Sequence, residues 1–178
     1  MVFWSTFIST KTREKDFNYY NPVDQEELDG YVESLLNYHT EEIENNRLRK
    51  FFNDLRKVYG YLHTSDDGSY QFFIKIDEVL LDGGGLTGSL LMMADTENKN
   101  NPYEETRYVL NGGTDGHMVE FFTTVNGKKT KLKGNFHESA TGFDLSFWAT
   151  NRKLLFHAVT EEEYKQKYEE FKTKAQSF

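Results

Sequence analysis

The dipeptide Asn126-Gly127 is the feature that most constrains how this chain can fold. It separates two runs in which apolar and polar side chains alternate, residues 117–125 and 128–137. A two-residue turn of this kind needs positive φ at both central positions, and it fixes the register of the two strands. One face then carries mostly apolar residues: His117, Val119, Phe121 and Val125 opposite Phe136, Gly134, Leu132 and Lys128. The other face carries Glu120 opposite Lys133, Phe122 opposite Lys131 and Thr124 opposite Lys129, so the sequence predicts a sheet with one buried and one exposed face. On the exposed face, Glu120 is expected to lie between Lys133 and Arg107 of the preceding strand.

The same alternation recurs from Val58 to Val159, with a glycine-rich or polar turn after each run. It predicts eight strands, at residues 58–63, 69–77, 86–94, 103–110, 117–125, 128–137, 142–149 and 153–159. A tight turn at Asn151-Arg152 is expected to align Phe147 with Phe156. Sequential strands joined by short turns favour an up-and-down antiparallel barrel, because closure leaves no exposed sheet edge.

Helical spacing flanks this region on both sides. Asn21-Pro22 is typical of a helix start, and apolar residues repeat at helical spacing after it: Leu28, Tyr31, Val32, Leu35 and Leu36. A second stripe follows Thr40, so the break at residues 37–40 favours a helical hairpin, with one long kinked helix as the alternative. Thr160 and Glu163 have the spacing of a capping box, which predicts a C-terminal helix.

These elements define an α+β fold with N-terminal helices, an eight-stranded antiparallel barrel and a C-terminal helix. We expect an N-terminal arm, with a short strand-like segment at residues 3–9, and a helical hairpin within residues 1–57. The barrel and its C-terminal helix are expected within residues 58–178, and the two regions are expected to form one compact unit.

Two short motifs resemble strands three and four of the avidin and streptavidin family. They are the run from Asp82 to Gly88, DGGGLTG, and the run from Arg107 to Gly112, RYVLNG. The resemblance covers roughly residues 58–159 and implies a barrel of the wider calycin type. The family's biotin-contacting pattern of Tyr, Ser, Thr and repeated Trp is mostly missing, and Leu90 and Leu132 stand at ligand positions. The resemblance therefore implies the architecture and not biotin binding.

Composition excludes several classes of function. The net charge is −8, which argues against a nucleic-acid-binding protein, because a phosphate backbone requires a basic face. Cysteine is absent, so thiolate chemistry and disulfides are excluded. No stretch approaches the roughly 20 apolar residues of a membrane-spanning helix. We expect a cytoplasmic protein without membrane association, or a secreted one if a signal segment has been removed, and no pattern indicates a cofactor or an oligomeric state.

Three histidines invite a metal-site interpretation, since imidazole is a common transition-metal ligand. The predicted register places His117 inside, whereas His137 and His157 alternate with interior phenylalanines and point out. These side chains are not expected to converge, and the sequence predicts no metal site.

The strongest candidate for a ligand site is the mouth of the barrel. The register directs Glu104, Thr106 and Tyr108 inward, and His117 is expected on the same interior face. An inward carboxylate beside a tyrosine is compatible with a ligand-orienting group, with a simple rim residue, or with a barrel enzyme that uses Glu104 and Tyr108. No combination of acid, base and nucleophile supports the enzyme interpretation.

An acidic stretch from Asp24 to Glu44 is the candidate protein-binding surface, with Glu26, Glu27, Glu41 and Glu42 as its contact residues. The sequence thus favours a non-enzymatic binding protein that presents an acidic helical surface to a basic protein partner, as an inhibitor or immunity-type protein does. A small apolar ligand inside the barrel is the alternative. The interior phenylalanines weaken that alternative, because they supply enough bulk to fill a small barrel.

Overall fold

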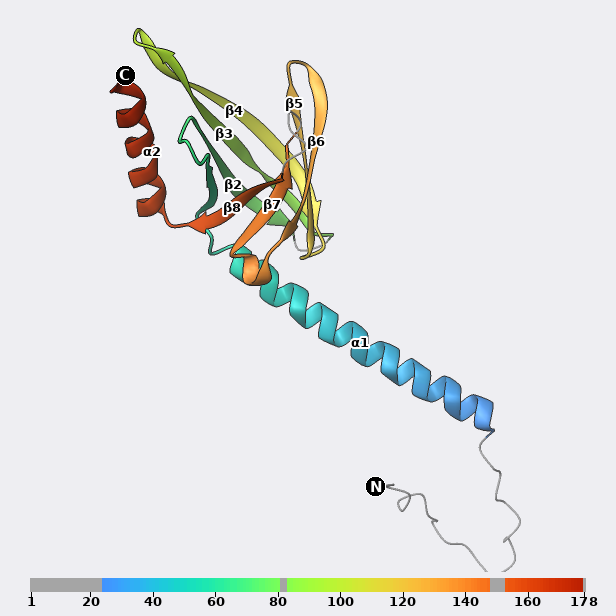
Figure 1. Ribbon diagram of the computed structural model, residues 1–178. Coiled ribbons are helices and arrows are strands. Elements are labelled where there is room, and N and C mark those ends of the chain that lie inside the picture. The colour runs from blue at the N-terminus through green and yellow to red at the C-terminus, as the bar shows by residue number, and fades with distance from the viewer. Residues whose placement is uncertain (1–23, 81–82, 148–152, 178) are drawn as a thin grey trace, which may run out of the picture. The chain divides into compact units, whose positions relative to one another are not determined.

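The computed structural model describes residues 24–80, 83–147 and 153–177, and confirms the α+β fold (Figure 1). Its elements are α1 (Gln25–Leu55), β1 (Gly60–Thr64), β2 (Tyr70–Leu80), β3 (Gly85–Asn98), β4 (Asn101–Thr114), β5 (Met118–Val125), β6 (Lys128–Phe136), the 3₁₀ turn η1 (Glu138–Ala140), β7 (Gly142–Ser146), β8 (Lys153–Val159) and α2 (Glu161–Gln176). The expected strand at residues 3–9 and the helix start at Asn21-Pro22 lie outside the described residues.

The eight strands form a closed antiparallel barrel in sequence order, and β8 pairs with β1 to complete it. The hairpin of β5 and β6 has the predicted register: Phe121 lies opposite Leu132 and Val125 opposite Lys128. Asn126 and Gly127 both have positive φ, 50° and 77°, as a two-residue hairpin turn requires. This turn therefore sets which side chains of the two strands enter the core.

The interior of the barrel is filled by side chains. Phe143 lies at its centre, with its ring centroid 4.7 Å from that of Tyr61 and 5.2 Å from those of Phe136 and Phe156. Phe121 and Phe143 are completely buried. Phe51 of α1 packs on Phe136 at 5.0 Å, so the last turns of α1 belong to the same core.

Two predicted registers are wrong. Phe156 pairs with Phe143 and not with Phe147, because the last β7–β8 pair is Ser146 with Lys153. The predicted turn at Asn151-Arg152 lies outside the described residues. We also expected Glu120 between Lys133 and Arg107. Glu120 instead contacts Lys131 and Lys133, at 2.8 and 3.1 Å. On β4 the residue opposite Glu120 is Gly113 and not Arg107.

The predicted helical hairpin is replaced by one continuous helix, α1. Residues 37–40 contain neither glycine nor proline, and the Thr40 hydroxyl donates to the Leu36 carbonyl at 2.8 Å, as a threonine inside a helix does. The chain divides into two compact units between Ile43 and Glu44, so the residues of α1 contribute to both.

Helix α2 begins with the predicted capping box. Thr160 Oγ1 accepts from Glu163 N, and Glu163 Oε2 accepts from Thr160 N at 2.7 Å. The helix packs on the outer face of the barrel, where Phe171 contributes to a second apolar cluster with Leu62, Phe73, Leu91 and Met93. Tyr168 Oη donates to Glu105 Oε1 at 2.6 Å, which fixes α2 to β4.

Candidate protein-binding surface

The helix formed by residues 25–43 of α1 exposes large apolar side chains. Tyr31, Leu36 and Tyr38 retain 64, 62 and 68% of their accessible surface, and Val32, Leu35 and Ile43 are exposed to a similar degree. Isolated exposed apolar residues are common, but a contiguous set on one element marks an interaction site. These six residues, with Leu28, are called the α1 stripe below.

The α1 stripe occupies one side of the helix. At about 100° per residue, Leu28, Val32, Leu35, Leu36 and Ile43 fall within an arc of roughly 100°, with the two tyrosines at its edge.

Carboxylates surround the α1 stripe. Residues 24–46 contain eight Asp and Glu and no Lys or Arg. The predicted contact residues Glu26, Glu27, Glu41 and Glu42 are all exposed. Glu26 and Glu27 lie in the first turn, where negative charge is favourable to the helix dipole. The four predicted residues and the apolar stripe thus share one helical segment.

The residues predicted at the barrel mouth differ in burial and in position. Thr106 and Tyr108 are half-buried on the inward-facing side of β4, as expected. Glu104 shares their side of the strand but is exposed, because it pairs with Ala94 towards the far end of the β3–β4 pair. At the ligand positions of the resemblance, Leu90 and Leu132 are completely buried in the core.

His117 was expected to face the interior, and the structure corrects this. The residue precedes β5, in a turn where Asp115 Oδ1 accepts from the backbone N–H groups of His117 and Met118 at 2.8 and 2.7 Å. Its side chain is exposed and lines an outer groove of about 320 Å³ together with His137, Arg47 and Lys50.

This groove has mixed charge. Arg47 Nη2 lies 2.6 Å from Glu44 Oε1, and this hydrogen bond holds the pKa of Glu44 below its ordinary value. Asp54 lines the groove as well. His117 and His137, expected to point to opposite sides, do line the same groove, but within the described part of the chain no three metal-ligating side chains come together.

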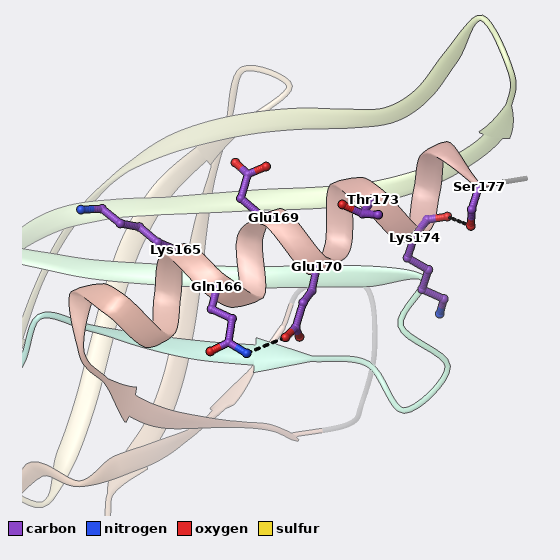
Figure 2. Close-up of a pocket in the computed structure, with 7 residues that line it drawn as sticks. All are labelled: Lys165, Gln166, Glu169, Glu170, Thr173, Lys174 and Ser177. Carbon is purple, nitrogen blue, oxygen red and sulfur yellow. Dashed lines mark hydrogen bonds between the residues drawn. The ribbon is translucent and has the colours of Figure 1, made fainter.

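A shallow hollow of about 770 Å³ lies along the outer side of α2. Figure 2 shows its lining residues, Lys165, Gln166, Glu169, Glu170, Thr173, Lys174 and Ser177, projecting from this single helix. Gln166 Nε2 donates to Glu170 Oε1 at 2.8 Å, an ordinary pair one helical turn apart. No second element supplies a facing wall among these lining residues, so the hollow is solvated helix surface.

A groove that the sequence did not suggest lies between β4 and β5, with a volume of about 530 Å³. Its lining includes the outward-facing residues Arg107, Val109 and Phe122, with Lys129 from β6. Val109 and Phe122 are 69 and 47% exposed. Both are apolar residues at outward positions of neighbouring strands, and that departure from the alternation is the signal by which the sequence could have indicated the groove.

No helix among the described residues has the length and apolar character needed to cross a membrane. No protein-family model, curated protein or solved structure matches this chain.

Proposed function

We propose that this chain is a non-enzymatic binding protein that presents the α1 stripe and its carboxylates to a basic protein partner. The observation that carries the proposal is the set of large apolar side chains on residues 31–43 that stay 47–68% exposed in a segment of strongly negative charge. An amphipathic helix of this kind is suited to an apolar groove lined by Lys and Arg, as in helix-in-groove recognition.

The two parts of the surface have different roles. The α1 stripe supplies apolar area, and each fully buried Leu or Ile contributes on the order of 1.5–3 kcal/mol. The carboxylates at the rim act chiefly on the rate of association, because they attract a basic partner before contact is made. An inhibitor or immunity-type protein, which must capture its target quickly, is the class that fits this division.

The charge of the segment also favours a different protein over a second copy of this chain. Two such helices side by side would place eight carboxylates against eight, with no Lys or Arg within residues 24–46 to neutralise them. Like charges brought together in this way oppose association.

The alternatives have less support. A small apolar ligand needs an interior cavity, whereas Phe121, Leu132, Phe143 and Phe156 are completely buried in the barrel core. The likeness to the avidin and calycin barrels rests on strand number and order, and it adds no ligand-contacting residue. Glu104 is exposed and pairs with Ala94 towards the far end of the β3–β4 pair, which gives little support to an enzyme that uses Glu104 and Tyr108.

Affinity capture from the native host, followed by kinetics with the captured protein, tests the proposal. Leu35→Ser should abolish capture, and Leu155→Ser on β8 is the matched control, since the two leucines are 51 and 45% exposed. Replacing Glu26, Glu27, Glu41 and Glu42 by Gln should slow association at low salt and leave the thermal midpoint nearly unchanged. Equal capture by the two serine variants would refute the proposal.

A further inference from the structure

Strand β4 is paired over a longer stretch on one side than on the other. Its pairing with β3 runs from Asn101 to Gly113, with one irregularity, whereas its pairing with β5 covers only Asn111–Thr114. Beyond that point the β3–β4 pair and the β5–β6 hairpin diverge (Figure 1). Among the described residues, no strand pairs with residues 103–110 of β4 on the β5 side.

The backbone hydrogen bonds show which residues face this gap. Thr114 N donates to Gly84 O at 2.9 Å, so the even-numbered residues of β4 bond to β3. Because successive residues of an antiparallel strand bond to alternate sides, the odd-numbered residues turn their N–H and C=O groups the other way. Glu105, Arg107 and Val109 therefore direct main-chain groups into the gap.

The same alternation of hydrogen bonds shows which residues of β5 face the gap. Phe136 N donates to His117 O, at 2.6 Å, so the odd-numbered residues of β5 bond to β6 and the even-numbered ones bond towards β4. The last such pair is Phe122 with Asn111, which leaves Thr124 directed into the gap. An unpaired edge of this kind is a template for another strand.

The groove at this gap has a definite chemical character. Arg107 and Lys129 are among its lining residues, and no carboxylate is. The nearby carboxylates have partners: Glu105 accepts from Tyr168, and Glu120 is bound by two lysines on β6. The groove therefore favours a ligand that carries negative charge.

A buried polar atom points to the same place. Thr123 is 6% exposed and lines the groove, and its Oγ1 has no hydrogen-bond partner among the described residues. A buried hydroxyl without a partner is costly, so a polar group from a bound molecule would be favourable there.

We infer that the gap between β4 and β5 binds an extended acidic segment of a partner protein as an added strand. Main-chain groups of Arg107 and Val109 bond to the segment, its carboxylates lie beside Arg107 and Lys129, and an inward hydroxyl reaches Thr123. This site does not depend on the α1 stripe, and it uses strand addition instead of helix docking.

Two synthetic peptides test the inference by NMR titration of the full chain. The first is an acetylated, amidated heptapeptide of sequence Val-Glu-Thr-Glu-Val-Glu-Thr, and the second has Lys in place of each Glu. The acidic peptide should shift the amide signals of Arg107, Val109 and Thr124 and slow exchange of the amide protons at Arg107 and Val109. The basic peptide should bind at least about tenfold more weakly, because repulsion replaces a favourable charge contact.

A backbone substitution separates strand addition from simple charge attraction. Val109→Pro removes an N–H that faces the gap and leaves the bonds to β3 in place, since edge positions of this kind tolerate proline. It should weaken the acidic peptide about tenfold, the effect of one lost hydrogen bond, whereas Val109→Thr should bind as the wild type does. A folded amide spectrum of each variant is the control for structure.

Several outcomes would overturn the inference. One is that millimolar acidic peptide does not shift the amide signals of Arg107, Val109 and Thr124. Another is that the shifts are confined to residues 25–43. A third is that the proline and threonine variants bind the acidic peptide equally well. Protection of the same amides in the protein alone that increases with concentration would make a second copy the occupant and would exclude the assigned one.

Discussion

The turn η1 offers the sharpest test of how the barrel is stabilised. Ser139 and Ala140 both have left-handed backbone conformations, with φ of 58° and 57°, and neither is glycine. Each such residue costs roughly 1–2 kcal/mol relative to a right-handed conformation. Tyr61 is 1% exposed, and its hydroxyl donates to the carbonyl of the fully buried Ala140 at 2.9 Å. This buried hydrogen bond therefore helps to hold the strained turn, together with the backbone bond from His137 N to Gly142 O at 2.8 Å that closes it.

Tyr61→Phe removes that hydrogen bond and leaves the Ala140 carbonyl buried without a partner. The expected loss in the free energy of unfolding is about 1–3 kcal/mol, and each kcal/mol lowers the thermal midpoint by roughly 2–4 °C for a chain of this size. Ser139→Gly should have the opposite sign, because glycine adopts positive φ without strain; the expected gain is about 0.5–1 kcal/mol after its larger chain entropy is subtracted.

Urea unfolding followed by circular dichroism measures both effects. Tyr31→Phe is the matched control, since the Tyr31 side chain is 64% exposed, and its change should stay within about 0.5 kcal/mol. If Tyr61→Phe is as neutral as this control, the hydroxyl does not stabilise the turn. A loss of stability on Ser139→Gly would show that the left-handed conformation is not strained.

Three further predictions concern the core and the pH dependence. Phe121→Ala should cost about 3–5 kcal/mol in urea unfolding, since Phe121 is fully buried, whereas Phe122→Ala should cost clearly less at 47% exposure; equal losses would refute the assigned faces. Glu120→Gln should change stability by less than about 1 kcal/mol, because the cross-strand pairs with lysine are exposed, and a failure to fold would contradict the register. Hydrogen bonds from the backbone and hydroxyl of Ser69 hold the pKa of Asp67 at about 2, below its ordinary value of 3.8. The ionised carboxylate therefore stabilises the fold fully above pH 3.8, and this stabilisation is lost as the pH falls through about 2. Asp67→Asn should remove this part of the pH dependence of the urea midpoint, and an unchanged pH dependence would disprove the assignment.

The barrel could be predicted from the sequence because its decisive information is local. Asn126-Gly127 fixes one hairpin, and from this turn the alternation assigns the faces of both strands, as the pairing of Phe121 with Leu132 confirms. The capping box at Thr160 fixed the start of α2 in the same way. Period and turn chemistry act over a few residues, so they can be read without the tertiary structure.

The sequence predictions are wrong where contacts between residues far apart in the chain determine the structure. The pairing of Phe143 with Phe156 is set by core packing that no local pattern encodes. His117 has the parity of an interior residue, but it precedes β5, where the turn at Asp115 leaves it exposed. The predicted break in α1 relied on the second apolar stripe that follows Thr40, but a helix can continue through such a change of stripe, as α1 does.

The groove between β4 and β5 escaped prediction for a related reason. It depends on where the pairing of the two strands stops, at Asn111 and Phe122, and this point lies inside both strands, which continue beyond it, so no strand end marks it in the sequence. The exposed face of α1 is different, because its charge and apolar spacing are visible in the sequence. Its predicted partner remains a prediction that the capture experiment must decide.

The filled barrel has a consequence for the entropy of binding. A hollow barrel can deform around a ligand, whereas side chains packed as closely as Tyr61, Phe143 and Phe156 hold the surrounding strands in one arrangement. The edges of β4 and β5 are then already ordered before anything binds between them, so an incoming strand loses its own conformational freedom but does not have to order the protein as well. Preorganisation of this kind makes a core filled with side chains a source of affinity at the surface.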